Sequence, residues 1–513
     1  MARRAIRNTG LTPRQWTMLR RVVQYAALFV FVALFVWSRR GGWPGMLVNF
    51  PMRLDPLAML AHLVSSRTLL TGSALALATV ALTVVFGRAW CGWLCPLGTL
   101  LDWFSPRRRP RPQAPPDSWR AVKYGLLLTL LAAALFSNLT LMVFDPLTLL
   151  FRTLSASVWP AIDQLITAAQ FTLYRVPILR PALSALDAVL RPKILPPDAA
   201  YYRYAWLYAG VFAAIISLNV FGRRFWCRYL CPLGGLLGLL SKGAIRRREV
   251  NPRCNQCDAC ARICPTGTIQ ASSDYASDPS ECTMCLECYR VCPQHAIDFP
   301  SHLSMASRKQ YDPSRRQALL ALGSAIAGIG LFRSDWRARR DHPRLIRPPG
   351  GRENDILSKC IRCAECSRAC PTSAIQPAIT EAGLEGLWSP VLVPRIGYCD
   401  YSCNACGQVC PVQAIPRLSL EQKRQQVIGK AYIDTNRCIP WSDGVPCGVC
   451  EEMCPVPDKA IQLEEMDVQD ADGQWVTLQR PHVIRDRCIG CGICEYKCPL
   501  NGEAAIRVYV PNG

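Results

Sequence analysis

The chain contains 513 residues, of which half are hydrophobic and 28 are cysteine, and it carries a formal net charge of +22. This length allows about three or four domains. A disulfide framework is not indicated, because such frameworks belong mainly to short secreted chains, so the clustered thiols point to metal ligation. Nucleic-acid binding is not indicated either, because the arginines flank apolar segments and no nucleic-acid-binding motif accompanies them.

Four apolar runs lie within the first 222 residues and predict membrane-spanning helices. A bilayer core requires about 20 helical residues, and the runs approach that length. Many arginines precede the first run, so the positive-inside rule places the N-terminus in the cytoplasm. The expected location is the bacterial inner membrane, crossed several times, with membrane lipid as a partner. The runs are Val22–Trp37, Thr68–Phe86, Tyr124–Phe144 and Tyr204–Phe221.

This apolar half repeats internally. The stretch LDPLAML, Leu54–Leu60, matches FDPLTLL, Phe144–Leu150, and each copy later reaches a Cys-x-x-x-Cys-Pro motif. We expect two copies of one helical hairpin, related by a pseudo-two-fold axis along the membrane normal. The connection 145–203 of the second copy is longer, and its spaced apolar residues predict amphipathic helices on the outer surface.

The two Cys-x-x-x-Cys-Pro motifs supply Cys91, Cys95, Cys227 and Cys231. Both follow helices that run inward, so both are expected at the cytoplasmic face. If the two copies face each other, the four thiolates converge and could hold a metal or an additional iron–sulfur centre. One alternative is that each motif forms its own local pair, either of free thiols or as a disulfide. Another is that the cysteines only cap and pack the helix ends. Their spacing leaves this open.

Six groups of four cysteines follow Val250, and they are typical of ferredoxins. In the pattern Cys-x2-Cys-x2-Cys-x3-Cys-Pro, three cysteines hold one [4Fe–4S] cluster and the fourth ligates its neighbour. The first two groups therefore predict one cluster on Cys254, Cys257, Cys260 and Cys292, and another on Cys282, Cys285, Cys288 and Cys264. Zinc fits less well, because zinc sites usually separate two Cys-x-x-Cys knuckles by a longer loop.

Four more groups follow the same logic, although two of them have a widened first gap. Paired in order, with their fourth cysteines exchanged, they predict two further two-cluster modules and six [4Fe–4S] clusters in all. An isoleucine closely follows each group, which suits a short strand over the cluster. The groups are Cys360, Cys363, Cys366 and Cys370; Cys399, Cys403, Cys406 and Cys410; Cys438, Cys447, Cys450 and Cys454; and Cys488, Cys491, Cys494 and Cys498.

A shorter apolar run, Ala318–Phe332, lies between the second and third groups and follows Arg315 and Arg316. A twin arginine before a weakly hydrophobic stretch indicates a Tat signal. We therefore expect a fifth anchor and a periplasmic location for residues 353–513. The competing interpretation is an interfacial helix with all six clusters in the cytoplasm, which the arginines beyond the run favour.

The expected fold class is a polytopic α-helical membrane domain, with four duplicated helices and a fifth anchor, joined to three α+β bacterial two-[4Fe–4S] ferredoxin modules. The membrane domain is expected at 1–245, the first module at 246–305, the anchor and linker at 306–352, and the remaining modules at 353–425 and 426–513.

The first half, with CGWLCPLG and CRYLCPLG before two ferredoxin groups, resembles NapH-type and NosR-type quinol dehydrogenase membrane proteins. The second half, from about Ser314, resembles NapG/MauM-type ferredoxins. The resemblance implies quinol as substrate, exchange with the quinone pool, and transfer of electrons to a redox partner such as a cytochrome or a periplasmic terminal reductase. No catalytic residue follows from it, although Asp55 and Asp145 are candidates for receiving quinol protons, or simply helix N-caps.

Two other functions compete with this quinol dehydrogenase hypothesis. One is an assembly or maturation factor that reduces a metal or cofactor for a respiratory oxidase or reductase. The other is a redox sensor, which the long series of clusters disfavours, because a sensor needs only one cluster.

Overall fold

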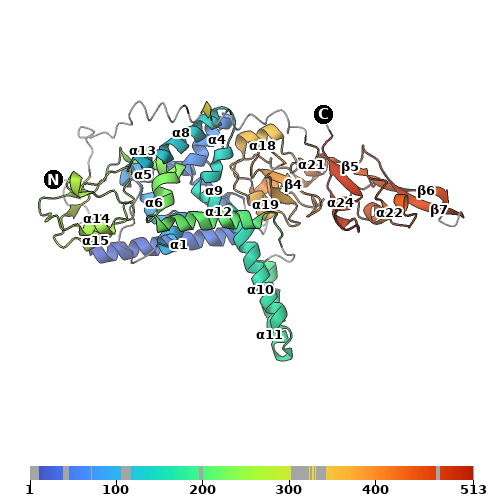
Figure 1. Ribbon diagram of the computed structural model, residues 1–513, viewed down its shortest axis with the longest axis horizontal. Helices are drawn as coiled ribbons and strands as arrows, with labels where there is room; N and C mark the ends of the chain where they lie inside the picture. Colours follow the sequence, from blue (N-terminus) through green and yellow to red (C-terminus); the bar gives the residue numbers. More distant parts are fainter. Residues whose placement is uncertain are drawn as a thin grey trace. The chain divides into compact units, whose positions relative to one another are not determined.

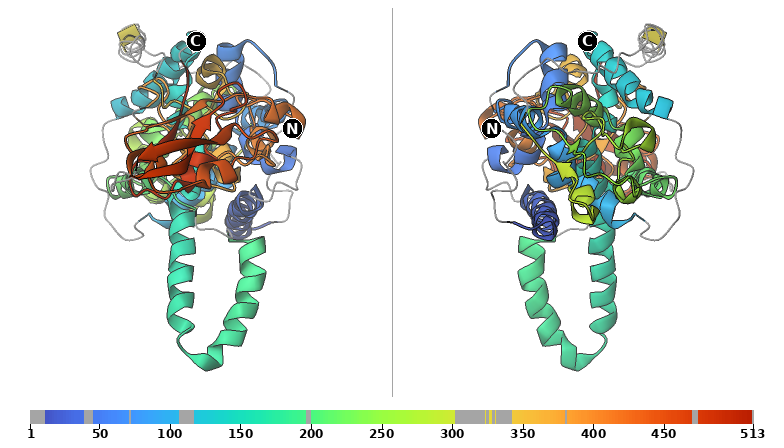
Figure 2. Two further views of the ribbon diagram at one scale, coloured as in Figure 1. Left: turned by 90° about the vertical axis from the view of Figure 1, so that its right-hand side faces the viewer. Right: turned by 90° about the vertical axis from the view of Figure 1, so that its left-hand side faces the viewer.

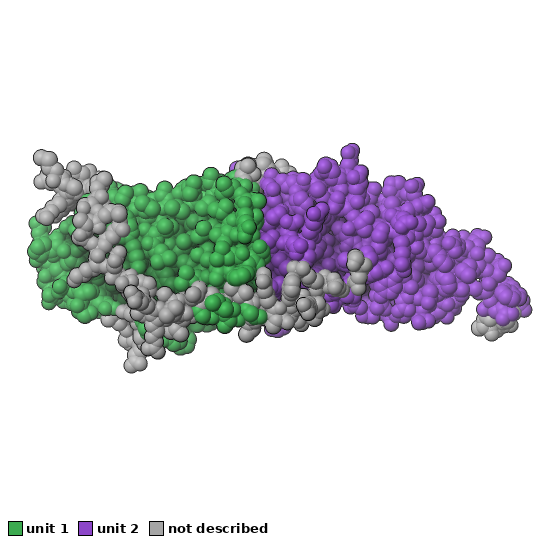
Figure 3. All heavy atoms as spheres, turned by 90° about the horizontal axis from the view of Figure 1, so that it is seen from above, with its two compact units in different colours: residues 1–36, 49–150, 209–330 green, residues 37–48, 151–208, 331–513 purple. Residues whose placement is uncertain are grey.

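The computed structural model describes residues 11–38, 45–70, 72–105, 117–195, 200–301, 323, 326–327, 330, 342–379, 381–469 and 474–511. The chain divides into two compact units, coloured separately in Figure 3. Unit 1 comprises residues 1–36, 49–150 and 209–330, and unit 2 comprises residues 37–48, 151–208 and 331–513. The first two cysteine groups therefore share a unit with most of the apolar helices.

The apolar helices contain the expected repeat (Figure 1). In both copies an Asp-Pro pair begins a helix, and later a helical turn carrying the first cysteine of the motif leads into a helix that begins at the proline after the second cysteine. The first copy contains α3 (Phe50–Arg53), α4 (Pro56–Ser66), α5 (Leu75–Phe86), α6 (Ala89–Trp93) and α7 (Pro96–Trp103) after α1 (Pro13–Trp37). The second contains η3 (Asp117–Arg120), α8 (Ala121–Leu135), η4 (Thr140–Phe144), α9 (Pro146–Thr153), α12 (Ala205–Ser217), η8 (Trp226–Leu230) and α13 (Pro232–Ser241).

Two helices in the described part of the chain are long and apolar enough to cross a membrane, Pro13–Trp37 and Ser118–Leu135. The other two expected spans contain shorter apolar helices, Leu75–Phe86 and Ala205–Val220. The second expected span starts late because Gly72, with a φ of 94°, turns the chain before α5. The third ends early because Ser137 adopts a φ of 58°, a left-handed conformation that stops α8.

The long connection of the second copy is helical, as expected. Helices α10 (Trp159–Leu173) and α11 (Arg180–Lys193) form an antiparallel hairpin, visible in both views of Figure 2. Arg191 ties the two helices together, since it pairs with Asp187 at 2.9 Å on its own helix and with Asp163 at 3.5 Å on the other. This hairpin belongs to unit 2.

Short antiparallel strands and one-turn helices surround the cysteine groups. The strand expected after each group is confirmed for four groups, where Ile297, Ile375, Ile461 and Ile506 begin strands. The strand pairs are β1 (Glu249–Val250) with β2 (Ile297–Asp298), β3 (Ile375–Pro377) with β4 (Pro390–Leu392), β5 (Lys430–Ile433) with β8 (Ile506–Tyr509), and β6 (Ile461–Gln469) with β7 (Trp475–Val483). The helices are α14 (Ala259–Ile263), α15 (Glu287–Val291), α19 (Glu365–Ala369), α20 (Ala405–Val409), α23 (Val449–Glu452) and α24 (Ile493–Lys497).

The expected twin-arginine anchor lies almost entirely outside the described residues. Arg315, Arg316 and most of Ala318–Phe332 fall between the described positions.

Candidate functional site

The cysteine loops share an unusual backbone conformation. In the four groups with regular spacing, the residue immediately before the second cysteine and the residue immediately after it both have positive φ, which is uncommon outside glycine. Positive φ at both positions turns the chain sharply around the second cysteine, and a main-chain N–H can then donate to a thiol of the same loop, as Arg362 N–H does to Cys360 Sγ at 3.4 Å. The residues are Gln256 and Asp258, Met284 and Leu286, Arg362 and Ala364, and Gly490 and Gly492.

In the first module the fourth cysteine of the first group lies beside the second group. Burial raises the pKa of Cys282 to about 12, and the thiols of Cys285 and Cys264 add to this rise. Burial also raises the pKa of Cys288, with contributions from the same two thiols. Cys264 is therefore placed with the three leading cysteines of the other group, as the exchanged pattern requires.

The second module has the same exchanged placement. Burial raises the pKa of Cys366 well above its usual value, and Cys360 and Cys410 add to the rise. Burial likewise raises the pKa of Cys406, with contributions from Cys399 and Cys370. Each fourth cysteine thus lies near the group that it does not belong to.

The third module repeats this arrangement despite its widened gap. Burial raises the pKa of Cys438 to about 11, and Cys447 and Cys498 contribute to it. Burial raises the pKa of Cys491 to about 12, and Cys488 and Cys454 contribute to that. Such buried thiolates require a compensating positive charge, which iron ions would supply. The four-thiol sets therefore fit [4Fe–4S] clusters in donor chemistry and grouping.

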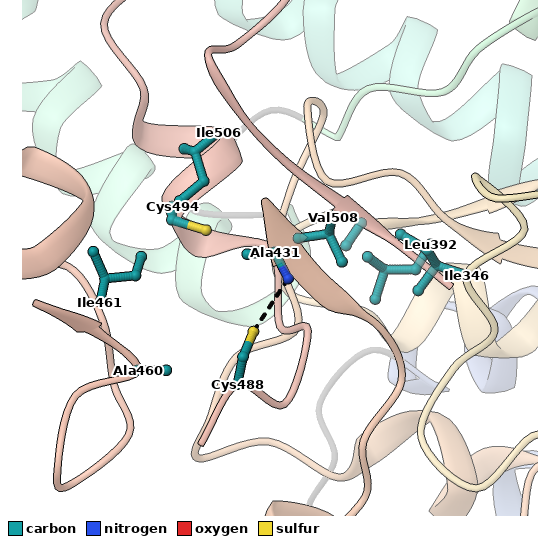
Figure 4. Packing of buried hydrophobic residues seen from close by; sticks show 10 residues of the cluster. Ile346, Leu392, Ala431, Ala460, Ile461, Cys488, Cys494, Ile506 and Val508 are labelled. Atoms are coloured by element: carbon teal, nitrogen blue, oxygen red, sulfur yellow. Dashed lines mark hydrogen bonds between the residues drawn. The ribbon is translucent and has the colours of Figure 1, made fainter. Parts of the chain in front are cut away.

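The second and third modules are joined directly at two of these sites. The main-chain N–H of Cys399 donates to the carbonyl of Cys491 at 2.8 Å, and the Cys399 thiol adds to the rise that burial causes in the pKa of Cys491. Figure 4 shows the surroundings of Cys488, whose Sγ accepts a hydrogen bond from Ala431 N at 3.3 Å. Buried isoleucines at 461 and 506 lie in the same apolar cluster. The two cluster sites are thus neighbours within unit 2.

The two Cys-x-x-x-Cys-Pro motifs are held to each other by a reciprocal pair of arginines. Arg88 Nη2 donates to the carbonyl of Cys227 at 3.3 Å, and Arg224 Nη1 donates to the carbonyl of Cys91 at 2.9 Å. Each arginine stands three positions before the first cysteine of its own motif. This exchange is what a pseudo-two-fold axis between the copies produces.

The second cysteine of each motif is a helix N-cap. Cys95 Sγ accepts from Gly98 N at 3.4 Å, and Cys231 Sγ accepts from Gly234 N at 3.2 Å. Burial raises the pKa of Cys227 to about 11, and Cys91 adds to the rise. Burial raises the pKa of Cys231 as well, and the other three thiols of the motifs add to that rise, so the four thiols converge.

No disulfide joins any of the 28 cysteines. Within the described ranges, no three histidine, cysteine, aspartate or glutamate side chains are grouped to hold a single metal ion. The hydrogen bonds to Gly98 and Gly234 show that Cys95 and Cys231 do cap helices, as one of the sequence-based alternatives expects. Convergence of all four thiols is also compatible with a shared centre larger than one ion.

The first motif packs against the first ferredoxin module. A Cβ on Gly92 would lie 2.1 Å from the carbonyl oxygen of Thr283, so the two backbones approach as closely as only glycine permits. Trp93 Nε1 donates to the carbonyl of Met284 at 2.9 Å. Thr283 and Met284 are the two residues between Cys282 and Cys285. The paired motif thus contacts the loop that carries these candidate ligands.

The second motif reaches the same module from its own copy. A Cβ on Gly267 would lie 2.8 Å from Arg228 Nη2, and Gly267 follows Cys264 by three residues. Both motifs therefore contact loops of one cysteine set, namely Cys264, Cys282, Cys285 and Cys288.

Buried ion pairs fix this contact. Arg88 Nη1 lies 3.1 Å from Glu281 Oε2, and Lys123 also pairs with Glu281. Although burial raises the pKa of the Glu281 carboxyl, these two cations lower it below its usual range. Between the two copies, Arg224 of the second copy donates two hydrogen bonds of 2.6 and 2.7 Å to Asp102 of the first.

The roles of Arg88, Arg224 and Glu281 do not follow from the cysteine spacing. The sequence does contain one indication of these roles: in each copy of the repeat an arginine stands two positions before the Trp-Cys pair. The aspartates Asp55 and Asp145 are brought together, and both are helix N-caps.

The fold and the cysteine sites define an iron–sulfur protein with several ferredoxin domains. Comparison with family models agrees: a "4Fe-4S binding domain" matches residues 68–113 and 202–252, a "4Fe-4S dicluster domain" matches 274–371, and another "4Fe-4S binding domain" matches 481–501. The first of these matches covers both Cys-x-x-x-Cys-Pro motifs. No solved structure matches the chain.

Curated relatives narrow the assignment. The chain is 36% identical to the methylamine utilization ferredoxin-type protein MauM of Methylorubrum extorquens, over 39% of this chain and 90% of that protein. It is 35% identical to the ferredoxin-type protein NapG of Escherichia coli K12, over 28% of this chain and 61% of that protein. MauN of Methylorubrum extorquens is 27% identical over 50% of this chain and 76% of its own length. The chain belongs to the MauM family of ferredoxin-type proteins.

Proposed function

We propose that this iron–sulfur protein oxidises quinol at the bacterial inner membrane and relays the electrons through [4Fe–4S] clusters to a reductase or cytochrome outside the cytoplasm. One observation carries the proposal: both Cys-x-x-x-Cys-Pro motifs, at the ends of apolar helices, contact the loops around Cys264, Cys282 and Cys285. That contact supplies a short route from the membrane half to the first ferredoxin module.

The proposed ligands of six clusters are the exchanged sets. The first module would use Cys254, Cys257, Cys260 and Cys292, and Cys282, Cys285, Cys288 and Cys264; the other two modules would use the corresponding sets. When bound, such clusters accept and pass on single electrons. The protein's own residues determine their spacing and, through burial and hydrogen bonds to sulfur, their potentials.

Cys91, Cys95, Cys227 and Cys231 are proposed to hold a further centre between the two copies. Their convergence, their burial and the family match over both motifs support this assignment. Arg88 and Arg224 would lie beside that centre and offset its negative charge.

The proposed topology has a cytoplasmic N-terminus, four membrane spans, a fifth anchor at Ala318–Phe332 that crosses to the other side, and a periplasmic second half. Apolar composition and the placement of arginines support it. A reporter enzyme fused after Gly513, in one version active only in the periplasm and in another only in the cytoplasm, tests the second half. Periplasmic activity that is lost when Arg315 and Arg316 become lysine is expected. Cytoplasmic activity would place the acceptor inside the cell.

Cluster reduction tests quinol oxidation itself. The purified protein, reconstituted in lipid, is mixed anaerobically with a reduced short-chain quinol, and bleaching of the iron–sulfur absorption is followed. Dithionite defines full reduction. We expect the quinol to reduce the clusters; clusters that respond only to dithionite would contradict the proposal.

A further inference from the structure

Asp55 and Asp145 occupy equivalent positions in the two copies and make equivalent bonds. Each begins the helix that follows it, α4 or α9, by accepting from two main-chain N–H groups with one carboxylate oxygen. Asp55 Oδ1 accepts at 2.8 and 3.3 Å from Leu57 and Ala58, and Asp145 Oδ2 accepts at 3.0 and 3.0 Å from Leu147 and Thr148. Each carboxyl therefore has one oxygen left.

The two remaining oxygens, Asp55 Oδ2 and Asp145 Oδ1, are buried without any other hydrogen-bond partner. The two side chains lie within hydrogen-bonding reach of each other, and their residues are 1% and 0% exposed. Two ionised carboxylates cannot remain at that separation in a buried site, because both desolvation and mutual repulsion oppose it. A single proton between the two oxygens would satisfy both of them.

The other buried acids of unit 1 are neutralised differently. In the described part of that unit, Glu281 and Glu287 are paired with arginine or lysine, and so is the less deeply buried Asp102. The influences on Asp55 are burial, Asp145 and its two main-chain donors. The pairs are Arg88 and Lys123 with Glu281, Arg20 with Glu287, and Arg224 with Asp102.

Burial raises the pKa of Asp55, and burial together with the charge of Asp55 raises the pKa of Asp145 well above its usual value. Both directions agree with a pair that retains a proton near neutral pH.

We propose that Asp55 and Asp145 form one acid–carboxylate pair that shares a single proton on the pseudo-two-fold axis, and that this pair is a proton acceptor for the membrane half. The role as acceptor rests on the proposed quinol oxidation, whereas the shared proton does not. Oxidation of a quinol releases two electrons and two protons. The electrons leave singly to the clusters, and the singly protonated pair takes up one proton at a time and returns it to the aqueous phase.

Infrared spectroscopy of the full-length protein in lipid, with its clusters present, tests the shared proton. At neutral pH the wild type should show a C=O band of a protonated carboxyl that shifts in deuterated water. Asp55→Asn and Asp145→Asn should each lose it, because an asparagine keeps the helix cap and donates its amide N–H where the proton was. The matched control is Asp187→Asn, which removes a partly exposed carboxylate on α11 and should leave the band unchanged. A wild type without the band, or a band that survives in both variants, would overturn the shared proton.

Reduction kinetics test the acceptor role separately. In Asp55→Asn/Asp145→Asn, reduction of the clusters by quinol should slow about 10²-fold, the effect typical of losing a general base. Reduction by dithionite, which needs no proton acceptor, should be unchanged. Equal quinol rates in wild type and double variant would overturn the acceptor role. A wild type that quinol cannot reduce would contradict the proposed function and the acceptor role together, while the infrared band would still decide whether the proton is shared.

Discussion

Arg88 and Arg224 make reciprocal hydrogen bonds between the two motifs: the guanidinium of Arg88 donates to the carbonyl of Cys227, and that of Arg224 donates to the carbonyl of Cys91. The two halves of the repeat are thereby locked to each other where their four cysteines converge. Each arginine also pairs with a carboxylate, Arg88 with the buried Glu281 and Arg224 with the partly buried Asp102. The same two side chains thus join the copies to each other, and Arg88 joins them to the ferredoxin module.

Replacing Arg224 by alanine is expected to destabilise the protein strongly. Its side chain is fully buried, and the change leaves Asp102 without its main partner, which typically costs about 3–5 kcal/mol. Chemical unfolding of the lipid- or detergent-solubilised protein measures the loss. The neighbouring Arg223→Ala is the control, because Arg223 is exposed and should change stability by no more than about 0.5 kcal/mol. Equal effects of the two substitutions would contradict the buried role of Arg224.

Replacing Gly92 by alanine should disturb the contact between the first motif and the ferredoxin module. The added Cβ would meet the Thr283 carbonyl, and overpacking of this kind costs about 1–3 kcal/mol. Gly125→Ala on α8 is the control, since nothing lies within 4 Å of its Cβ position. That change should be neutral or stabilise the helix by about 0.5–1 kcal/mol. Thermal unfolding compares them, and a harmless Gly92→Ala would argue against the close approach.

Serine substitutions test the exchanged ligands of the first module. Cys264→Ser should perturb the cluster of Cys282, Cys285 and Cys288, whereas Cys292→Ser should perturb the cluster of the first group. Electron paramagnetic resonance of the reduced protein distinguishes the two signals. If Cys264→Ser altered the cluster of its own group instead, the exchanged placement would be refuted.

Replacing Cys91, Cys95, Cys227 and Cys231 together by serine tests the centre proposed between the two copies. We expect the iron content per chain to fall while the signals of the ferredoxin clusters remain, because serine can still cap α7 and α13. Unchanged iron content would contradict the proposed centre and leave only the capping role of Cys95 and Cys231.

The contribution of Asp102 should depend on pH. Although burial raises the pKa of this carboxyl, the charge and hydrogen bonds of Arg224 and the charge of Arg20 hold it below its usual value. A lowered folded pKa gives stability that is present above the unfolded value, about 3.9, and is lost as the pH falls through the folded value. The difference in melting temperature between wild type and Asp102→Asn should therefore be largest near neutral pH and shrink below about pH 4. A constant difference would contradict this assignment.

The cysteine groups were accessible to sequence reasoning because cluster ligation requires a local spacing. The same holds for the strands at Ile297 and Ile375, which close the loops within a few residues. Helix ends were less accessible: hydropathy alone placed a span across Tyr124–Phe144, whereas Ser137 turns the chain and ends α8 at Leu135. An average of hydropathy over a window does not detect a single residue that ends a helix through its backbone conformation.

Contacts between distant segments could not be inferred from spacing. The residues around Gly92 do not indicate that Thr283 lies against it, because the two residues are 191 positions apart in the sequence. What requires glycine at position 92 is the short distance to the Thr283 backbone. The pairing of Asp55 with Asp145 could be predicted in part from the sequence. The duplication placed Asp55 and Asp145 at matching positions, but only the fold brings the second oxygen of each carboxyl to the other.

The hydrogen bond from Cys399 N–H to the Cys491 carbonyl has a consequence for how this protein can change over time. Because both groups belong to the main chain, no exchange of a side chain deletes the bond, and only proline at position 399 would remove its donor. Proline there would also destroy a candidate ligand. The link between the second and third modules is therefore insensitive to substitutions of side chains, and surface residues around it can diverge while the two cysteine loops stay joined.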